Sequence, residues 1–172
     1  MQPNPAVRWK MGNDFVPNEF QVPKGLETPH FKLRPLTIHD AVKDYEAVMS
    51  SAARIKGVLG PDVNWPREDL TLEQDLIDLG WHHKEFQIRS SFAYTVMSLD
   101  ENRCLGCIYF YASEVANYDA MVVMWVRDSE MDKGLDSELF SAVKKWVEND
   151  WPFRAVAYPG RETDWSECNS FR

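Results

Sequence analysis

A glycine turn between a strand pattern and a helix pattern is the first candidate for ligand binding in this chain. The apolar, β-branched run Ala120–Val126 leads into a charged loop that holds Gly134, and residues with helical spacing follow at once. The start of a helix presents unpaired backbone N–H groups and the positive end of the helix dipole. The usual occupant of such a place is a phosphate. The sequence therefore predicts a phosphate-binding turn around Gly134.

The charges of this loop oppose that prediction. Two basic residues, Arg127 and Lys133, face five acidic ones: Asp128, Glu130, Asp132, Asp136 and Glu138. Like charges at this range cost about 1 kcal/mol each when they are exposed. Acidic residues also favour the first turn of any helix, so their presence has a purely structural explanation as well.

Two further groups have the residue types of a metal site but not its spacing. Cys104 and Cys107 lie on one expected strand, where an odd separation sends their sulfurs to opposite faces. His82 and His83 are neighbours on an expected helix, about 100° apart, so they cannot chelate one ion as an i, i+4 pair does. We therefore expect core packing for the cysteines and no metal site.

The elements that must position these residues begin after a proline-rich arm. Residues 1–30 hold half of the prolines, and within them residues 7–16 have the pattern of one strand or a loose hairpin laid on the main body. A solvated leader is the alternative. Residues 31–36 then alternate as a strand, and two capping boxes, Thr37 with Asp40 and Thr71 with Gln74, open helices that run to about residues 53 and 84.

A change to a period of two follows from Ser91. Residues 91–97, 104–112 and 120–126 are expected to form a three-strand antiparallel meander joined by polar turns. Amphipathic spacing from Leu135 to Val147 predicts the helix after Gly134, and residues 154–158 predict one more strand. Because that strand follows a crossover helix, it should run parallel to Ala120–Val126.

Composition limits the class of protein. A chain of 172 residues with 44% hydrophobic residues suits one compact domain, residues 31–172, preceded by the arm. A net charge of −8 argues against nucleic acid and against anionic membranes as partners. Three cysteines form no disulfide framework, and we find no leader peptide or apolar run of membrane-spanning length. We expect a soluble, cytoplasmic protein.

The order strand, two helices, three-strand meander, glycine loop, helix and strand resembles the GNAT (Gcn5-related N-acetyltransferase) family over residues 31–158. The resemblance implies an α/β fold with a mixed sheet. In that family a Gln/Arg-x-x-Gly-x-Gly/Ala loop holds the pyrophosphate of acetyl-coenzyme A (acetyl-CoA) through backbone N–H groups. The corresponding residues here are Met131, Asp132, Lys133, Gly134, Leu135 and Asp136, and of the motif only the middle glycine is kept.

The resemblance also implies roles for individual residues. Backbone groups of Met124, Trp125 and Val126 would pair with the pantetheine arm where the fourth and fifth strands splay apart, and a strand N–H near Trp125 or Val126 would stabilise the oxyanion. The candidates for the general base are Glu114 and Asp119, although both types are common in solvated turns. Tyr158 is the candidate for protonating the thiolate, with packing as its alternative. Trp65 and Trp81 would border the acceptor, or pack at the rim of the core.

We therefore expect an acetyl-CoA-dependent N-acyltransferase for a small amine or peptide amine. The acidic composition weakly favours a cationic acceptor. Two alternatives are a non-catalytic GNAT-like binding or dimerisation module and a different sheet-and-helix ligand-binding domain, which would lack the splay beside Val126. The tail is too short for the family's last helix and two strands, so the arm, or a second subunit in a homodimer, is expected to cover the gap.

Overall fold

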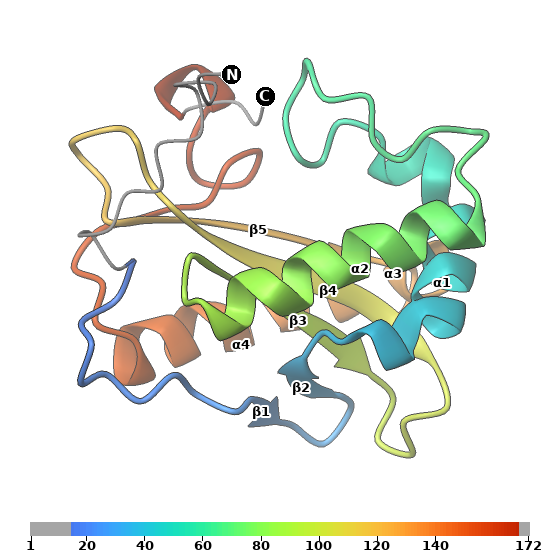
Figure 1. Ribbon diagram of the computed structural model, residues 1–172, viewed down its shortest axis with the longest axis horizontal. Coiled ribbons are helices and arrows are strands. Elements are labelled where there is room, and N and C mark those ends of the chain that lie inside the picture. Colours follow the sequence, from blue (N-terminus) through green and yellow to red (C-terminus); the bar gives the residue numbers. More distant parts are fainter. Residues whose placement is uncertain (1–14, 169–172) are drawn as a thin grey trace, which may run out of the picture.

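A six-stranded mixed sheet forms the centre of the protein, whose computed structural model describes residues 15–168 (Figure 1). The strands neighbour one another in chain order. They are β1 (Leu26–Glu27), β2 (Lys32–Pro35), β3 (Ser91–Met97), β4 (Cys104–Ala112), β5 (Ala120–Val126) and β6 (Val156–Ala157). β3, β4 and β5 are the predicted antiparallel meander, and β6 is parallel to β5 as predicted.

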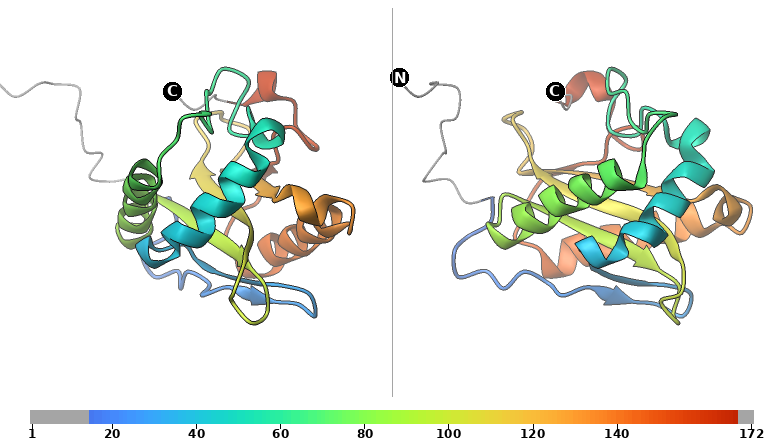
Figure 2. Two further views of the ribbon diagram at one scale, coloured as in Figure 1. Left: turned by 90° about the vertical axis from the view of Figure 1, so that its right-hand side faces the viewer. Right: turned by 45° about the vertical axis from the view of Figure 1, so that its right-hand side comes forward.

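Helices cover both faces of the sheet. α1 (Ala41–Ile55) and α2 (Leu72–Gln87) lie on one face, while α3 (Asp128–Met131) and α4 (Leu135–Asp150) lie on the other (Figure 2, left). Short 3₁₀ turns, η1 (Ile38–Asp40) and η2 (Trp165–Glu167), precede α1 and follow β6. All residues of β3 and β5 are buried, which agrees with the continuous apolar sequence of β5, whereas β3 also buries the polar Ser91 and Thr95. Within the described part of the chain, no helix has the length and apolarity needed to cross a membrane.

The pairing of β5 with β6 stops early. Only Ala120 with Val156 and Met121 with Ala157 are in register, so β5 continues for five residues beyond its last partner on this side. The splay that the sequence resemblance implied is therefore present, and it leaves an open strand edge from Val122 to Val126.

Both predicted capping boxes are present. Thr71 Oγ1 accepts a hydrogen bond from the Gln74 N–H at 3.2 Å, and Gln74 Oε1 accepts one from the Thr71 N–H at 3.0 Å. The Asp40 carboxylate closes the first box by accepting the Thr37 N–H at 2.9 Å. These caps fix where each helix starts and therefore which of its residues face the sheet.

The face that α2 turns inward is not its apolar one. Leu72, Leu76 and Ile77 are 41–54% exposed, whereas Asp75 is only 2% exposed and Leu79 is buried beside it. Asp75 and Leu79 face a cleft beneath α2 that polar and aromatic side chains line.

The described part of the arm packs on the sheet. Val16 is 1% exposed, and the Phe15 ring stacks on Phe92 and Phe153 with centroids 5.6 and 5.1 Å apart. β1 then pairs with β2. The strand or hairpin predicted for residues 7–16 falls largely outside the described residues.

Candidate functional sites

The first cleft lies along the open edge of β5, and we call it the β5 cleft. Its volume is about 340 Å³. The end of α1 with the turn after it, the loop before α4 and the segment after β6 surround it together with β5, so four separate stretches of sequence meet there. Three of the residues that line it are basic: Arg54, Lys56 and Arg161.

Two arginines reach the carbonyls of the open strand edge. Arg161 donates to the Met124 carbonyl at 3.4 Å and holds Asp136 with two hydrogen bonds of 2.7 and 2.9 Å. Arg54 donates to the Val126 carbonyl and to Asp128. The open edge therefore presents backbone acceptors, with guanidinium groups already placed at its rim.

The N–H groups of this edge follow from the direction of its carbonyls. In a strand, the N–H and C=O of one residue point to the same side. Met124 and Val126 thus direct their N–H groups toward the cleft, and Trp125 directs its own toward β4. Of the two oxyanion donors that the sequence offered, this geometry favours Val126 over Trp125.

The predicted phosphate turn has the expected backbone form. Gly134 has φ +77° and its N–H bonds the Met131 carbonyl at 3.0 Å, while no side-chain cap closes the start of α4. Met131 and Asp136 line the β5 cleft. Asp132 is exposed and Leu135 is buried in the core. For binding a phosphate, the loop thus offers mainly the backbone N–H groups at the start of α4 and few of its side chains.

Charges from outside the loop compensate its acidic residues. Arg54 pairs with Asp128, Arg161 pairs with Asp136, and Lys133 pairs with Glu130 at 3.1 Å. Burial alone would raise the pKa of Glu130, but its hydrogen bonds to Lys133 and Ser129 and the charge of Arg103 lower it. A count of charges within residues 127–138 overstates the repulsion, because two compensating cations lie outside this range: Arg54 on α1 and Arg161 after β6.

A second cleft, the α2 cleft, lies between α1, α2 and β4 and has a volume of about 330 Å³. Four carboxylates line it, those of Asp44, Asp75, Asp78 and Glu85, together with the ring of His82. None of the described residues that line it is a lysine or an arginine. The cleft is therefore acidic, in contrast to the β5 cleft.

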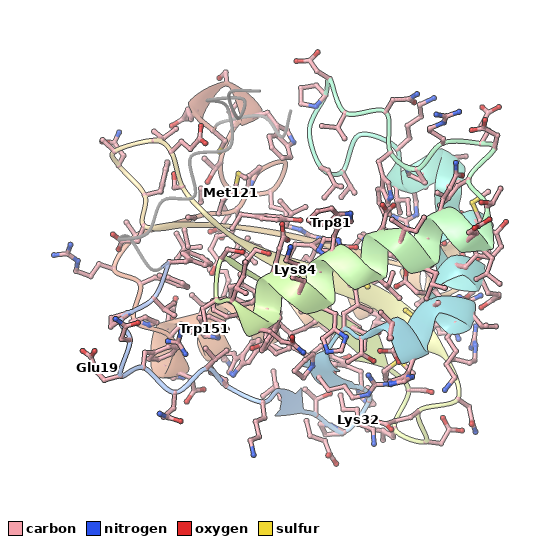
Figure 3. All side chains as sticks on the ribbon, viewed as in Figure 1. Glu19, Lys32, Trp81, Lys84, Met121 and Trp151 are labelled. Carbon is pink, nitrogen blue, oxygen red and sulfur yellow. The ribbon has the colours of Figure 1, made fainter. Side chains whose placement is uncertain are left out.

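Aromatic rings form the walls of the α2 cleft. Tyr109 and Tyr111 stand on β4, and Trp65 comes from the loop after α1. Trp81 stands on α2 (Figure 3). The Lys84 ammonium lies 5.1 Å from the Trp81 ring (Figure 3). Trp65 and Trp81 thus border a cleft, as expected from the resemblance.

Trp125 separates the two clefts. Its backbone belongs to the open β5 edge, while its indole is 1% exposed and donates a hydrogen bond to the Tyr109 hydroxyl at 3.3 Å. The Trp65 ring lies 6.1 Å from it. The basic and the acidic cleft therefore approach each other on either side of this aromatic group.

Two polar side chains in the α2 cleft have an unpartnered buried atom, Asp75 Oδ2 and His82 Nδ1. Burial is the main reason that the pKa of Asp75 is raised to about 8, and the nearby Asp44 and Asp78 carboxylates add to it. Burial lowers the pKa of His82, so the ring is neutral at pH 7. A carboxyl group with a pKa near neutrality has the property that a general base needs.

The predicted catalytic residues lie elsewhere. Asp119 accepts the N–H groups of Arg154 and Ala155 at 2.7 and 3.1 Å, which lowers its pKa. It precedes β5 and is about 23 Å along the strand from Val126. Glu114 is exposed in the same connection, and neither acid lines the two clefts. These two positions favour a structural use of both acids.

Tyr158 is buried and packs edge-on against Phe140, with ring centroids 5.3 Å apart. Its pKa is raised to about 12, chiefly by burial. These contacts favour the packing alternative that the sequence offered for this tyrosine.

The predicted placement of the two strand cysteines is wrong. β4 has a bulge at Leu105, because Val96 pairs with Gly106 while Met97 pairs with Cys104. The extra residue reverses the alternation, so Cys104 and Cys107 share one face and both approach Asp44, with Sγ to Oδ1 distances of 3.9 and 3.1 Å. Ligand atoms of the three residues lie within 4.8 Å of one another, a set that suits a thiophilic cation.

Among the residues that line the two clefts, the sequence indicated the β5 edge, the loop residues and the two tryptophans as site residues. It did not indicate the others. Asp75, Asp78, His82 and Glu85 recur at i, i+3, i+7 and i+10, and this polar stripe was the available signal. Arg161, which follows a Pro-Gly turn, carries no comparable signal.

Comparisons with known proteins give a shared fold. No family model and no curated protein matches the sequence. Among solved structures, a ribosomal-protein-S5-alanine acetyltransferase from Vibrio fischeri is similar, with 15% identity and a TM-score of 0.57 over 72% of this chain and 66% of that one, slightly less than two thirds of its length.

Two complexes are similar to the same degree. The ribosomal L7/L12 alpha-N-protein acetyltransferase RimL, in complex with coenzyme A, has 17% identity and a TM-score of 0.55 over 72% of this chain and 67% of that one. The microcin C7 self-immunity acetyltransferase MccE, in complex with acetyl-CoA and AMP, has 14% identity and a TM-score of 0.56 over 74% and 68%. At such identities the likeness concerns the fold.

Proposed function

We propose that this chain, which has the fold of the GNAT acetyltransferases, is an acetyl-CoA-dependent N-acyltransferase for a small amine or peptide amine. One observation carries the proposal: the splay of β5 from β6 leaves backbone hydrogen-bonding groups beside a cleft rimmed by cations. RimL and MccE, which share this fold, were solved with coenzyme A and with acetyl-CoA.

The β5 cleft has the groups that such a cosubstrate needs. Arg54, Lys56 and Arg161 would balance its phosphates, together with the N–H groups at the start of α4. The Met124 carbonyl, now bonded by Arg161, would accept an amide N–H of the pantetheine arm. Bound in this way, acetyl-CoA would supply an acetyl thioester near Val126.

The α2 cleft would hold the acceptor amine. In its deprotonated form, Asp75 would take the proton that an ammonium group must lose before it can attack a thioester, in place of Glu114 and Asp119. The Val126 N–H would stabilise the oxyanion of the tetrahedral intermediate. The Trp125 and Trp65 rings between the clefts would keep water from the reacting atoms.

Thermal unfolding with added acetyl-CoA tests the proposal. We expect a saturable rise in the unfolding temperature at micromolar ligand. Arg161→Gln should raise the Kd about 10-fold, because a charge-assisted contact contributes about 1.5 kcal/mol. Arg154→Gln, which changes an arginine that is 92% exposed in its side chain, is the matched control. No stabilisation up to millimolar acetyl-CoA would instead support the non-catalytic module.

A further inference from the structure

We propose that the α2 cleft takes a linear polyamine as acceptor, that is, a chain of methylene groups with two or more ammonium groups. The inference rests on the proposed function and names its substrate class. The arrangement of acids and aromatic rings in the cleft supports this substrate class.

The acids form a row along one face of α2. Asp75, Asp78 and Glu85 line the cleft at positions i, i+3 and i+10, so they span about 15 Å of helix. Asp44 adds a carboxylate from α1 at the inner end. A row of this length matches charges that are spaced along an extended ligand, whereas a monoamine would use only one part of it.

Two buried polar atoms along the row have no hydrogen-bond partner. Asp75 is 2% exposed and its Oδ2 has no hydrogen-bond partner, although buried carboxylate oxygens are nearly always bonded. Nδ1 of His82, about two turns further along α2, is also buried without a hydrogen-bond partner. An ammonium group has three donors and would satisfy such acceptors.

The walls suit the methylene groups between the charges. Tyr109, Tyr111, Trp65 and Trp81 offer apolar ring faces, which also attract cations. A volume of about 330 Å³ lies in the range of small-molecule sites. An amino-acid acceptor fits poorly, because its own carboxylate would lie among four others with no cation in the lining.

The inner ammonium group of the polyamine is the one that is acetylated. The inner ammonium gives one proton to a carboxylate of the cleft, and its nitrogen forms the new C–N bond with the thioester carbon. The C–S bond then breaks, and the second proton of the nitrogen neutralises the departing thiolate. The outer ammonium groups keep their charge and their contacts with Asp78 and Glu85 throughout.

Calorimetric titration without acetyl-CoA tests this inference apart from the proposed function. The probes are 1,4-diaminobutane, spermidine and the matched monoamine 1-aminobutane. We expect the diamine and spermidine to bind at least 10-fold more tightly than the monoamine. Asp78→Asn and Glu85→Gln should each raise the diamine Kd about 2- to 5-fold, the effect of one partly exposed ion pair, and leave the monoamine Kd unchanged.

Glu73→Gln is the matched control, because Glu73 is exposed on α2 outside the cleft. Equal affinity for diamine and monoamine, or an equal loss in Glu73→Gln, would overturn the inference and leave acetyl-CoA binding untouched. Diamine binding without any acetyl-CoA binding would instead refute the transferase and retain the polyamine site.

Discussion

Asp75 shows how the surroundings of one side chain set its chemistry. An aspartate on a helix surface has a pKa near 4. Here the helix turns this residue toward the sheet, where burial and the carboxylates of Asp44 and Asp78 raise its pKa to about 8. The folded protein therefore holds a proton that the unfolded chain releases over most of the physiological range.

This proton uptake predicts how stability depends on pH. Between about pH 4 and 8 the folded state binds more protons than the unfolded state, so the free energy of unfolding falls as pH rises. The titration of one group changes the free energy of unfolding by at most about 1.4 kcal/mol per pH unit. We expect a smaller change here because the cleft admits water. Asp75→Asn removes the effect, so the variant should gain stability relative to the wild type from pH 5 to pH 8.

Urea unfolding at four pH values checks this prediction. Asp62→Asn, which changes an exposed acid in the loop after α1, is the control and should follow the wild-type curve. Parallel curves for the wild type and Asp75→Asn would show that the carboxyl group titrates normally.

Among the elements, β4 makes a very close backbone contact with β5 at Gly106. A Cβ on Gly106 would lie 2.0 Å from the Trp125 carbonyl oxygen, so the strand needs glycine beside its bulge. Gly106→Ala should therefore lower the free energy of unfolding by more than about 2 kcal/mol. The β5 edge would move with it, because Gly106 pairs with Val126.

A second glycine serves as the matched control. Gly80 lies within α2, and a Cβ there would find only Ile38 Cγ2, at 4.0 Å. Gly80→Ala should raise the free energy of unfolding by up to about 1 kcal/mol through helix propensity. Denaturant curves for both variants decide the matter, and equal effects would contradict the contact assigned to Gly106.

The elements themselves could be predicted because their periods are local. Both capping boxes, the strands of the meander and the helix before the parallel last strand each follow from a residue pattern within one short segment of the sequence. The bulge at Leu105 could not be predicted, since a two-residue period carries no sign of one extra residue. That single residue decides whether Cys104 and Cys107 share a face. The inward face of α2 was equally hidden, because the cleft beneath it comes from other elements.

At the scale of the whole molecule, the distribution of charge matters more than its sum. A net charge of −8 conceals a basic β5 cleft and an acidic α2 cleft on two sides of Trp125. Arg54 and Arg161 reach the first cleft from positions 107 residues apart, so no local count of charges could reveal them. The candidate sites depend on such long-range contacts, which explains why sequence located the β5 edge but not its cations.

The arm tests whether the molecule unfolds as one unit. Val16 is 1% exposed in the same core as the central strands, and the Phe15 ring stacks between two rings of that core. If residues 15–30 are integral to the domain, Val16→Asp should lower the free energy of unfolding by about 3 kcal/mol, because it buries an unpaired charge. Asn18→Asp adds the same charge at an exposed position two residues away and should change stability by less than about 0.5 kcal/mol. Urea unfolding followed by tryptophan fluorescence measures both variants, and equal stabilities would mean that the arm packs on a domain that does not need it.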